Sequence, residues 1–281
     1  MVGPRILVIE GNVASLRARQ VAAQGYDTAT GYARVLAGLA PEVECTIVRP
    51  ADAEPRVPAG VELGSFDGAV ITGSALNVYD GGPAIERQLE LTRAVCGAGV
   101  PLFGSCWGLQ IAVTVAGGRV TRNPRGREFG FGRAIALTKA GSAHALYAGK
   151  PAVFEAPTVH LDHVETLPPG AVVLAGNDYG VQAAAFSCGR SSVWAVQYHP
   201  EYDYLDISAV AARYGSRLVT EGLFPDEAAL AAFIADAKAL QENPSDATLL
   251  ERHALGPAMR DAALRRAELS NWLTQVVRAG V

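Results

Sequence analysis

A cysteine between two glycines has the clearest capacity for chemistry in this chain. Residues 100–110 read VPLFGSCWGLQ, so an apolar run leads into Gly104, Cys106 and Gly108, and a helix-compatible segment follows. This order is typical of a nucleophile elbow, a sharp strand-to-helix turn that projects a reactive side chain above a sheet. The glycines remove Cβ atoms where a tight turn brings backbone segments together. The helix N-terminus would favour the thiolate of Cys106, and the N–H of Trp107 would face the charge on an attacked carbonyl.

A histidine and a glutamate at the end of a later apolar run could complete that chemistry. Residues 193–201 read VWAVQYHPE, which places His199 at the end of an expected strand and Glu201 two positions further on. An imidazole can take the thiol proton and later protonate a leaving amine. A carboxylate can orient the imidazole and stabilise its charged form. Cys106, His199 and Glu201 therefore predict cysteine-dependent amide hydrolysis, provided that folding brings them together.

The segments that must position these residues alternate between apolar runs and helix-like stretches. We expect strands at 6–9, 43–48, 68–72, 102–104, 172–175, 183–186 and 193–197, and helices at 14–24, 32–39 and 85–98. Strands that are apolar at nearly every position and are joined by helices indicate an α/β fold with a mostly parallel sheet, covered on both faces. In such sheets, ligands bind outside the carboxyl ends of the strands.

Two later regions depart from this alternation of apolar runs and helix-like stretches. Residues 125–169 are richer in Gly, Pro and short apolar runs, which predicts a small antiparallel addition beside the main sheet. Helical spacing then dominates, with one helix expected at 208–221 and another beginning at Asp226. We therefore divide the chain into a main domain, 1–222, and a helical C-terminal extension, 223–281. The extension would cover the sheet edge, form a dimer contact or dock a partner, and simple packing is favoured.

Composition limits the classes of protein to consider. Of 281 residues, 49% are hydrophobic and 19% are charged, which is typical of a globular chain, and the net charge of -4 gives no reason to expect nucleic-acid or anionic-membrane binding. We expect no membrane span and no signal peptide. Four scattered cysteines without metal-type spacing argue against zinc and disulfides, and a reducing, cytoplasmic location fits. A local basic cluster is expected to form a solvated pocket rim, with contact to a partner or a substrate as the alternative: Arg119, Arg122, Arg125, Arg127 and Arg133.

The two motifs together resemble class I glutamine amidotransferases. The sequences GSCWGLQ at 104–110 and QYHPE at 197–201 match in order and spacing, particularly with the amidotransferase domain of GMP synthase and its free-standing relatives. The resemblance covers about residues 5–220. It implies a flavodoxin-like sheet, a Cys106–His199–Glu201 triad, no cofactor and no metal. It also implies that Cys106 forms a γ-glutamyl thioester and releases ammonia before water hydrolyses the intermediate.

Two weaker segments extend this resemblance to substrate binding. Residues 67–74 are similar to the family's oxyanion loop, which implies that the N–H groups of Gly73 and Trp107 form the oxyanion hole. Serine and alanine follow Gly73 where the family usually has Gly-Gly-Pro. The segment HLDHV at 160–164 is similar to a family segment near the substrate, with leucine in place of glycine. The resemblance implies that Gln110 and Asp162 contact the substrate.

Three functions remain open on the sequence. The first is a glutamine-hydrolysing component that supplies ammonia to a separate synthetase subunit, since we find neither a second large domain nor a glycine-rich phosphate loop. The second is a free-standing γ-glutamyl hydrolase that acts on a small γ-glutamyl amide or peptide. The third is a non-catalytic thiol sensor or binding protein. A homodimer is compatible with all three.

Overall fold

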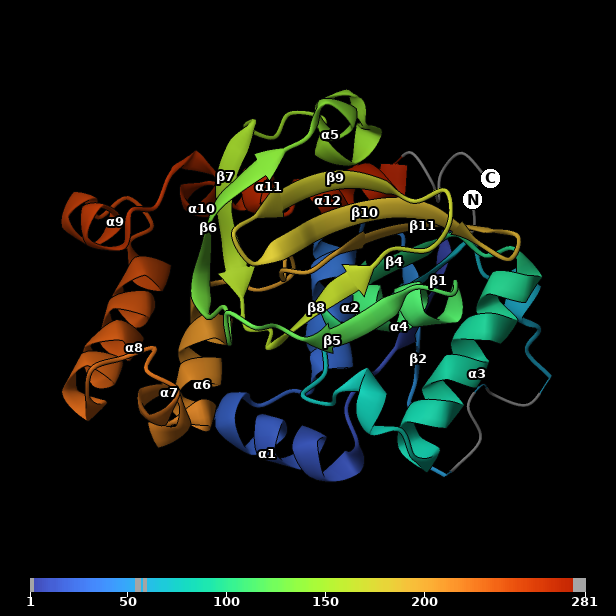
Figure 1. The fold of residues 1–281 in the computed structure, drawn as a ribbon, viewed down its shortest axis with the longest axis horizontal. Helices are drawn as coiled ribbons and strands as arrows, with labels where there is room; N and C mark the ends of the chain where they lie inside the picture. The colour runs from blue at the N-terminus through green and yellow to red at the C-terminus, as the bar shows by residue number, and fades with distance from the viewer. Residues whose placement is uncertain (1–2, 54–56, 58–59, 275–281) are drawn as a thin grey trace.

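The computed structural model describes residues 3–53, 57 and 60–274 (Figure 1). The strands are β1 (Arg5–Ile9), β2 (Glu44–Val48), β3 (Gly68–Ile71), β4 (Leu102–Ser105), β5 (Arg119–Arg122), β6 (Gly130–Leu137), β7 (Val153–Thr158), β8 (Asp162–Thr166), β9 (Val172–Asn177), β10 (Gly180–Cys188) and β11 (Ser191–Val196). The helices are α1 (Ala14–Gln24), α2 (Thr28–Leu39), α3 (Pro83–Ala98), α4 (Trp107–Val115), α5 (Lys139–Ala143), α6 (Tyr204–Tyr214), α7 (Ser216–Thr220), α8 (Glu227–Glu242), α9 (Ala247–His253), α10 (Pro257–Arg260), α11 (Ala262–Arg265) and α12 (Ala267–Trp272).

The main sheet combines a parallel half with an antiparallel half. Its described strands follow the order β2-β1-β3-β4-β11-β10-β9-β6-β7. Neighbours from β2 to β11 are parallel, and neighbours from β11 to β7 are antiparallel. Strands β5 and β8 form a separate antiparallel pair. The predicted α/β class with an antiparallel addition is confirmed, and that addition both lengthens the main sheet and supplies the separate pair.

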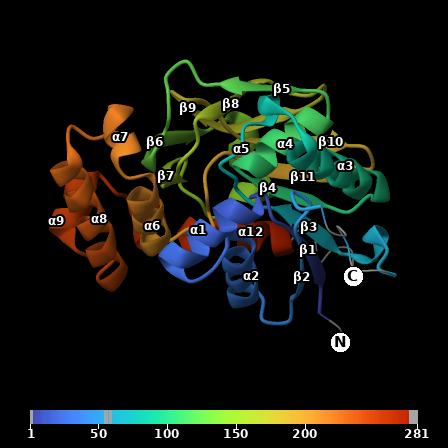
Figure 2. The ribbon, with the colours of Figure 1, turned by 90° about the horizontal axis from the view of Figure 1, so that it is seen from below.

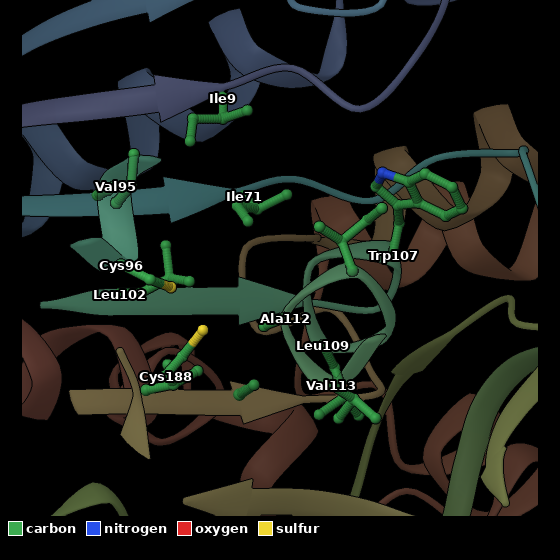
Figure 3. Packing of buried hydrophobic residues seen from close by; sticks show 14 of the residues in the cluster. Ile9, Ile71, Val95, Cys96, Leu102, Trp107, Leu109, Ala112, Val113 and Cys188 are labelled. Atoms are coloured by element: carbon green, nitrogen blue, oxygen red, sulfur yellow. The ribbon is translucent and has the colours of Figure 1, made fainter. Parts of the chain in front are cut away.

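Because successive side chains of each strand point to opposite faces of the sheet, the core is divided into two layers. In β1, Leu7 and Ile9 pack with α3 and α4, whereas Ile6 and Val8 pack with α2 and α12. Successive side chains of a strand point to opposite faces, so an uninterrupted apolar strand supplies both layers at once. Figure 2 shows the parallel strands between these two groups of helices. Figure 3 shows the α3–α4 layer, in which the sulfur atoms of Cys96 and Cys188 point toward each other.

Two expectations about the later helices need correction. The single helix expected at 208–221 is broken, because α6 ends at Tyr214 and Gly215 adopts φ 54° before α7 begins. The C-terminal helices cover a face of the sheet and not simply its edge: Trp272 of α12 packs against Phe103 of β4, with ring centroids 5.8 Å apart. The domain boundary at residue 222 stays a prediction, and residues 275–281 of the proposed extension lie outside the described residues.

Buried polar contacts of Glu268 tie α12 to Lys150 and to Tyr198, which directly precedes the candidate histidine. Lys150 Nζ lies 2.9 Å from Glu268 Oε1, and the two side chains are 1% and 0% exposed. The hydroxyl of Tyr198 donates to the same Glu268 oxygen at 2.5 Å. A buried carboxylate is tolerated only while it is paired and hydrogen-bonded. The backbone next to His199 is thus held from behind by the C-terminal helices.

Removing the cation of this pair should destabilise the whole fold. We expect Lys150→Met to lower the free energy of unfolding by about 3–5 kcal/mol, because it leaves the Glu268 carboxylate buried without a countercharge. Urea denaturation followed by circular dichroism measures this loss. The matched control is Arg252→Met, which breaks an exposed pair with Asp236 and should change stability by no more than about 1 kcal/mol. Equal effects of the two substitutions would contradict the role assigned to the buried pair.

Candidate active site

Cys106 occupies a strained turn between β4 and α4. Its backbone has φ 52° and ψ −100°, a region that residues with a Cβ rarely adopt. The surrounding glycines are required by close backbone contacts. A Cβ at Gly108 would lie 2.3 Å from the carbonyl oxygen of Ile71, and one at Gly104 would lie 2.5 Å from the carbonyl carbon of Gly108. The predicted elbow is therefore present, and it holds the thiol at the carboxyl end of β4.

Parallel pairing brings His199 to the same edge of the sheet as Cys106. Strand β11 lies beside β4, with Val196 opposite Ser105, so the residues that follow each strand are neighbours. The ring Nδ1 of His199 lies 2.8 Å from Glu201 Oε1, and the ring stacks on Tyr202 with centroids 4.1 Å apart. The sulfur, the imidazole and the carboxylate that the sequence singled out thus meet at one place.

The charge state of His199 is set by opposing effects. Burial by itself would lower the pKa of His199, but the charge of Glu201 and the interaction with the Cys106 thiol outweigh it and raise that pKa to about 10. Within the described chain, Nε2 of His199 has no hydrogen-bond partner. The ring is therefore positively charged near neutral pH. Its Nε2 is the nitrogen that can interact with the thiol and with a substrate.

Gly73 lies against the imidazole. A Cβ at position 73 would lie only 2.5 Å from His199 Cε1, so only glycine fits this approach without displacing the ring. Trp107 differs, because its indole is buried and Nε1 donates to Gln88 Oε1 at 2.8 Å. Only the backbone of Trp107 can face a substrate, and its N–H is among the first of α4, where helices have amides without intrahelical partners.

One pocket joins most of the residues predicted from the sequence. Gly73, Cys106, Gln110, Asp162 and His199 all line it, while Glu201 lies behind the histidine. Burial raises the pKa of the Asp162 carboxyl, although the hydroxyl of Tyr79 donates to it at 2.8 Å. Gln110 is held by a long hydrogen bond of 3.4 Å from its Nε2 to Gln197 Oε1. Both predicted substrate contacts are therefore placed at the pocket, and their roles stay predictions.

The expectation of a solvated arginine rim is wrong for Arg127. Its side chain is only 5% exposed, its Nε lies 2.7 Å from Glu221 Oε2, and its guanidinium stacks on the Tyr214 ring. Arg127 lines the pocket, and so do Arg213 and Arg217. The ion pair joins positions 94 residues apart, so the spacing of the arginines alone gave no signal of it.

Glu10 is a buried acid that the sequence reasoning missed. It follows β1 and accepts hydrogen bonds from the backbone N–H groups of Asn12 and Ala29 at 2.9 and 2.7 Å. Burial raises the pKa of Glu10 to about 7, and the two backbone donors only partly offset that rise. Because Asn12 lines the pocket, Glu10 helps to fix one of its walls. The signal in the sequence was a single charged residue, Glu10, directly after an apolar strand.

Comparison with known proteins identifies the family. A family model described as "Glutamine amidotransferase class-I" matches residues 30–205. This chain belongs to the class I glutamine amidotransferase family. Family membership makes it an amidotransferase-type hydrolase, as the resemblance implied.

Two curated relatives illustrate the range of the family. A γ-glutamyl-L-1-hydroxyisopropylamide hydrolase from a Pseudomonas species is 32% identical over 97% of this chain and 93% of the relative. A glutamine-hydrolysing GMP synthase from Thermomicrobium roseum is 31% identical over 52% of this chain, but that match covers only 25% of the synthase. The similarity to the hydrolase thus extends along both proteins, whereas the similarity to the synthase is partial.

Solved structures support the fold. A glutamine amidotransferase from Thermotoga maritima aligns over 98% of both chains, with a TM-score of 0.63 and 17% identity. One from Methylobacillus flagellatus aligns over 98% of this chain and 96% of its own, with a TM-score of 0.57 and 17% identity. At this identity the likeness concerns architecture, and it confirms the flavodoxin-like arrangement of the family. None of the described helices is long and apolar enough to cross a membrane.

Proposed function

We propose that this protein is a free-standing hydrolase of γ-glutamyl amides, with Cys106, His199 and Glu201 as its catalytic triad. The observation that carries the proposal is the meeting of a strained Cys106 elbow with a buried His199–Glu201 pair at one pocket. The similarity to a γ-glutamyl amide hydrolase over nearly the full length of both chains favours this substrate class.

The proposed reaction has two stages. His199 holds the proton of the Cys106 thiol while the sulfur attacks the γ-carbonyl carbon. The N–H groups of Gly73 and Trp107 stabilise the negative charge that develops on the carbonyl oxygen. His199 protonates the leaving nitrogen, the C–N bond breaks, and a γ-glutamyl thioester remains. His199 then takes a proton from water as the water oxygen bonds to the thioester carbon, the C–S bond breaks and glutamate leaves, which regenerates the starting pair of the Cys106 sulfur and the protonated imidazole. Glu201 keeps the imidazole oriented and its charged form stable throughout.

A second candidate is a glutaminase component that passes ammonia to a separate synthetase subunit. The partial similarity to a GMP synthase favours it, because that relative is described as glutamine-hydrolysing. A homodimer is compatible with either candidate. The remaining alternative, a thiol sensor, retains a reactive Cys106 without turnover.

Substrate turnover with and without a partner separates these candidates. We expect the purified protein alone to release glutamate from γ-glutamyl methylamide with a higher kcat/KM than from glutamine, measured by a coupled glutamate assay. Glutamine hydrolysis that rises strongly only when cell extract is added would instead favour the synthetase component. Absence of turnover in both conditions, with Cys106 still alkylated, would favour the sensor and overturn both enzymatic candidates.

A further inference from the structure

The last turn of α6 brings to the active-site pocket an arginine with an unpaired side-chain nitrogen. Arg213 lines the pocket, and its Nη1 is buried with no hydrogen-bond partner in the part of the chain that the structure describes. The two other arginines of this wall differ, because Arg127 and Arg217 both pair with Glu221, at 2.7 and 2.8 Å. A buried charged donor without an acceptor is costly unless a ligand satisfies it. Arg213 is therefore the arginine of this wall that is available to an anionic ligand group.

Arg213 lies on the histidine side of the pocket. Helix α6 begins shortly after His199, and the Tyr202 ring between them stacks on the imidazole. Burial raises the pKa of Tyr202, and the positive charge of Arg213 opposes that rise, so the guanidinium is within electrostatic reach of this ring. Val210, one helical turn before Arg213, lines the same pocket. This face of α6 extends the wall from the imidazole outward.

Arg127 extends from the α6 side of the pocket, where it stacks on Tyr214, toward the segment that precedes Asp162. Its Nη1 donates to the carbonyl oxygen of Val159, immediately before the segment that contains Asp162. Its charge acts on Asp162, where it opposes the rise in pKa that burial causes. The pocket thus has one buried cation that is paired with Glu221 and acts on Asp162, and a second cation near Tyr202 whose Nη1 has no described partner. Because Arg127 is paired with Glu221, Arg213 is the cation that retains a donor for a carboxylate of the substrate.

The proposed reaction places the amine half of the substrate on the side of the pocket that contains His199. The imidazole must protonate the leaving nitrogen, so that nitrogen lies beside His199 and any substituent on it extends along the adjoining wall. That wall contains Leu16 and Gln20 of α1, which packs against α6. Figure 1 shows these two helices side by side below the sheet. The glutamyl half then extends toward Gln110 and Asp162.

We propose that Arg213 binds a carboxylate on the amine half, so that the preferred substrates are γ-glutamyl amides of amino acids. This inference rests on the proposed hydrolase function and narrows its substrate class. Guanidinium groups suit carboxylates because their planar donors match both oxygens. The overall reaction consumes one water and releases glutamate and a free amino acid, with the γ-amide bond broken through the Cys106 thioester.

A pair of substrates that differ in one charge tests Arg213 directly. γ-Glutamylglycine carries the second carboxylate, and γ-glutamylglycinamide replaces it with a neutral group of similar size. We expect the wild-type protein to prefer the acid by about 10- to 100-fold in kcat/KM, as a charge-assisted hydrogen bond supplies. Arg213→Gln should reduce this ratio to about one, with most of the loss in the value for γ-glutamylglycine. Glutamate release measures both substrates in the same way.

A matched variant at Arg217 tests the role of Arg213 separately from the proposed hydrolase function. Arg217→Gln removes an exposed arginine from the same wall and should preserve most of the wild-type ratio, because that arginine pairs with Glu221. A wild-type ratio near one, or equal losses for both substrates in Arg213→Gln, would overturn the assignment. The second result would place Arg213 at the glutamyl half or in a structural role. If the wild type hydrolyses neither these compounds nor glutamine, the hydrolase proposal fails first.

Discussion

We expect Cys106→Ala to reduce the proposed γ-glutamyl amide hydrolysis by about 10⁴-fold or more, while the protein folds normally. The loss is large because no thioester can form, and the remaining groups only bind and polarise the amide. The fold survives because alanine keeps the Cβ that already occupies the φ 52° turn, so the backbone strain is unchanged. Steady-state kinetics together with a thermal unfolding curve measures the two properties separately.

The cysteines that serve as core residues provide the control for this substitution. Cys188 is 3% exposed within the α3–α4 layer, far from the Cys106 turn in the sequence. Cys188→Ala should reduce thermal stability through lost packing and keep turnover within a few-fold of the wild type. Undiminished hydrolysis in Cys106→Ala, with a loss in Cys188→Ala, would transfer the nucleophile to another position.

His199→Ala should slow hydrolysis by about 10²- to 10⁴-fold, because both stages need the imidazole. The first stage loses the proton donor to the leaving nitrogen, and the second loses the base that activates water. Single-turnover measurements with a γ-glutamyl amide should show slow formation of the acyl-enzyme. Glu201→Gln should be milder, since the amide oxygen can still accept from His199 Nδ1, which lies 2.8 Å from the carboxylate in the native protein. A larger loss in Glu201→Gln than in His199→Ala would contradict these roles.

The raised pKa of His199 gives this group a defined pH dependence. Its pKa in the folded protein is about 10, above the ordinary histidine value, so the folded state holds this proton more tightly than the unfolded state. The resulting contribution to stability is fully present below about pH 6.5 and is lost as the pH rises through about 10. We expect leaving-group protonation to fail over the same upper range, and the His199→Ala variant to lack this basic limb in its residual rate.

The sequence predicted the strands and pointed to the proposed triad because both depend on local pattern. Apolar runs defined β1, β3, β4 and β11, and each predicted strand is present with ends that shift by a few residues. The triad followed from chemistry at the ends of β4 and β11, two strands that pair in the sheet. Helix α2 begins earlier than predicted because Asp27 caps it, accepting a hydrogen bond from the N–H of Thr30.

Features that depend on distant contacts could not be read from the sequence. The pairing of Lys150 with Glu268 joins segments that have no shared motif, and only the fold makes both side chains fully buried. Arg213 resembles any arginine at a helix end until the pocket shows that its Nη1 has no described partner. The placement of Trp272 against Phe103 likewise required the path of the C-terminal helices across the sheet. Long-range packing, not local propensity, decides such contacts.

Identifying the residue that a glutamine-like electrophile labels tests most directly whether Cys106 is the nucleophile. The protein would be incubated with a chloromethyl ketone analogue of glutamine, digested and examined by mass spectrometry. We expect one adduct per chain, on the peptide that contains Cys106, and protection from labelling by a γ-glutamyl amide. Labelling of Cys45, Cys96 or Cys188 in place of Cys106, or full hydrolytic activity in the fully labelled protein, would contradict a mechanism in which the thiol at the β4–α4 turn is the nucleophile.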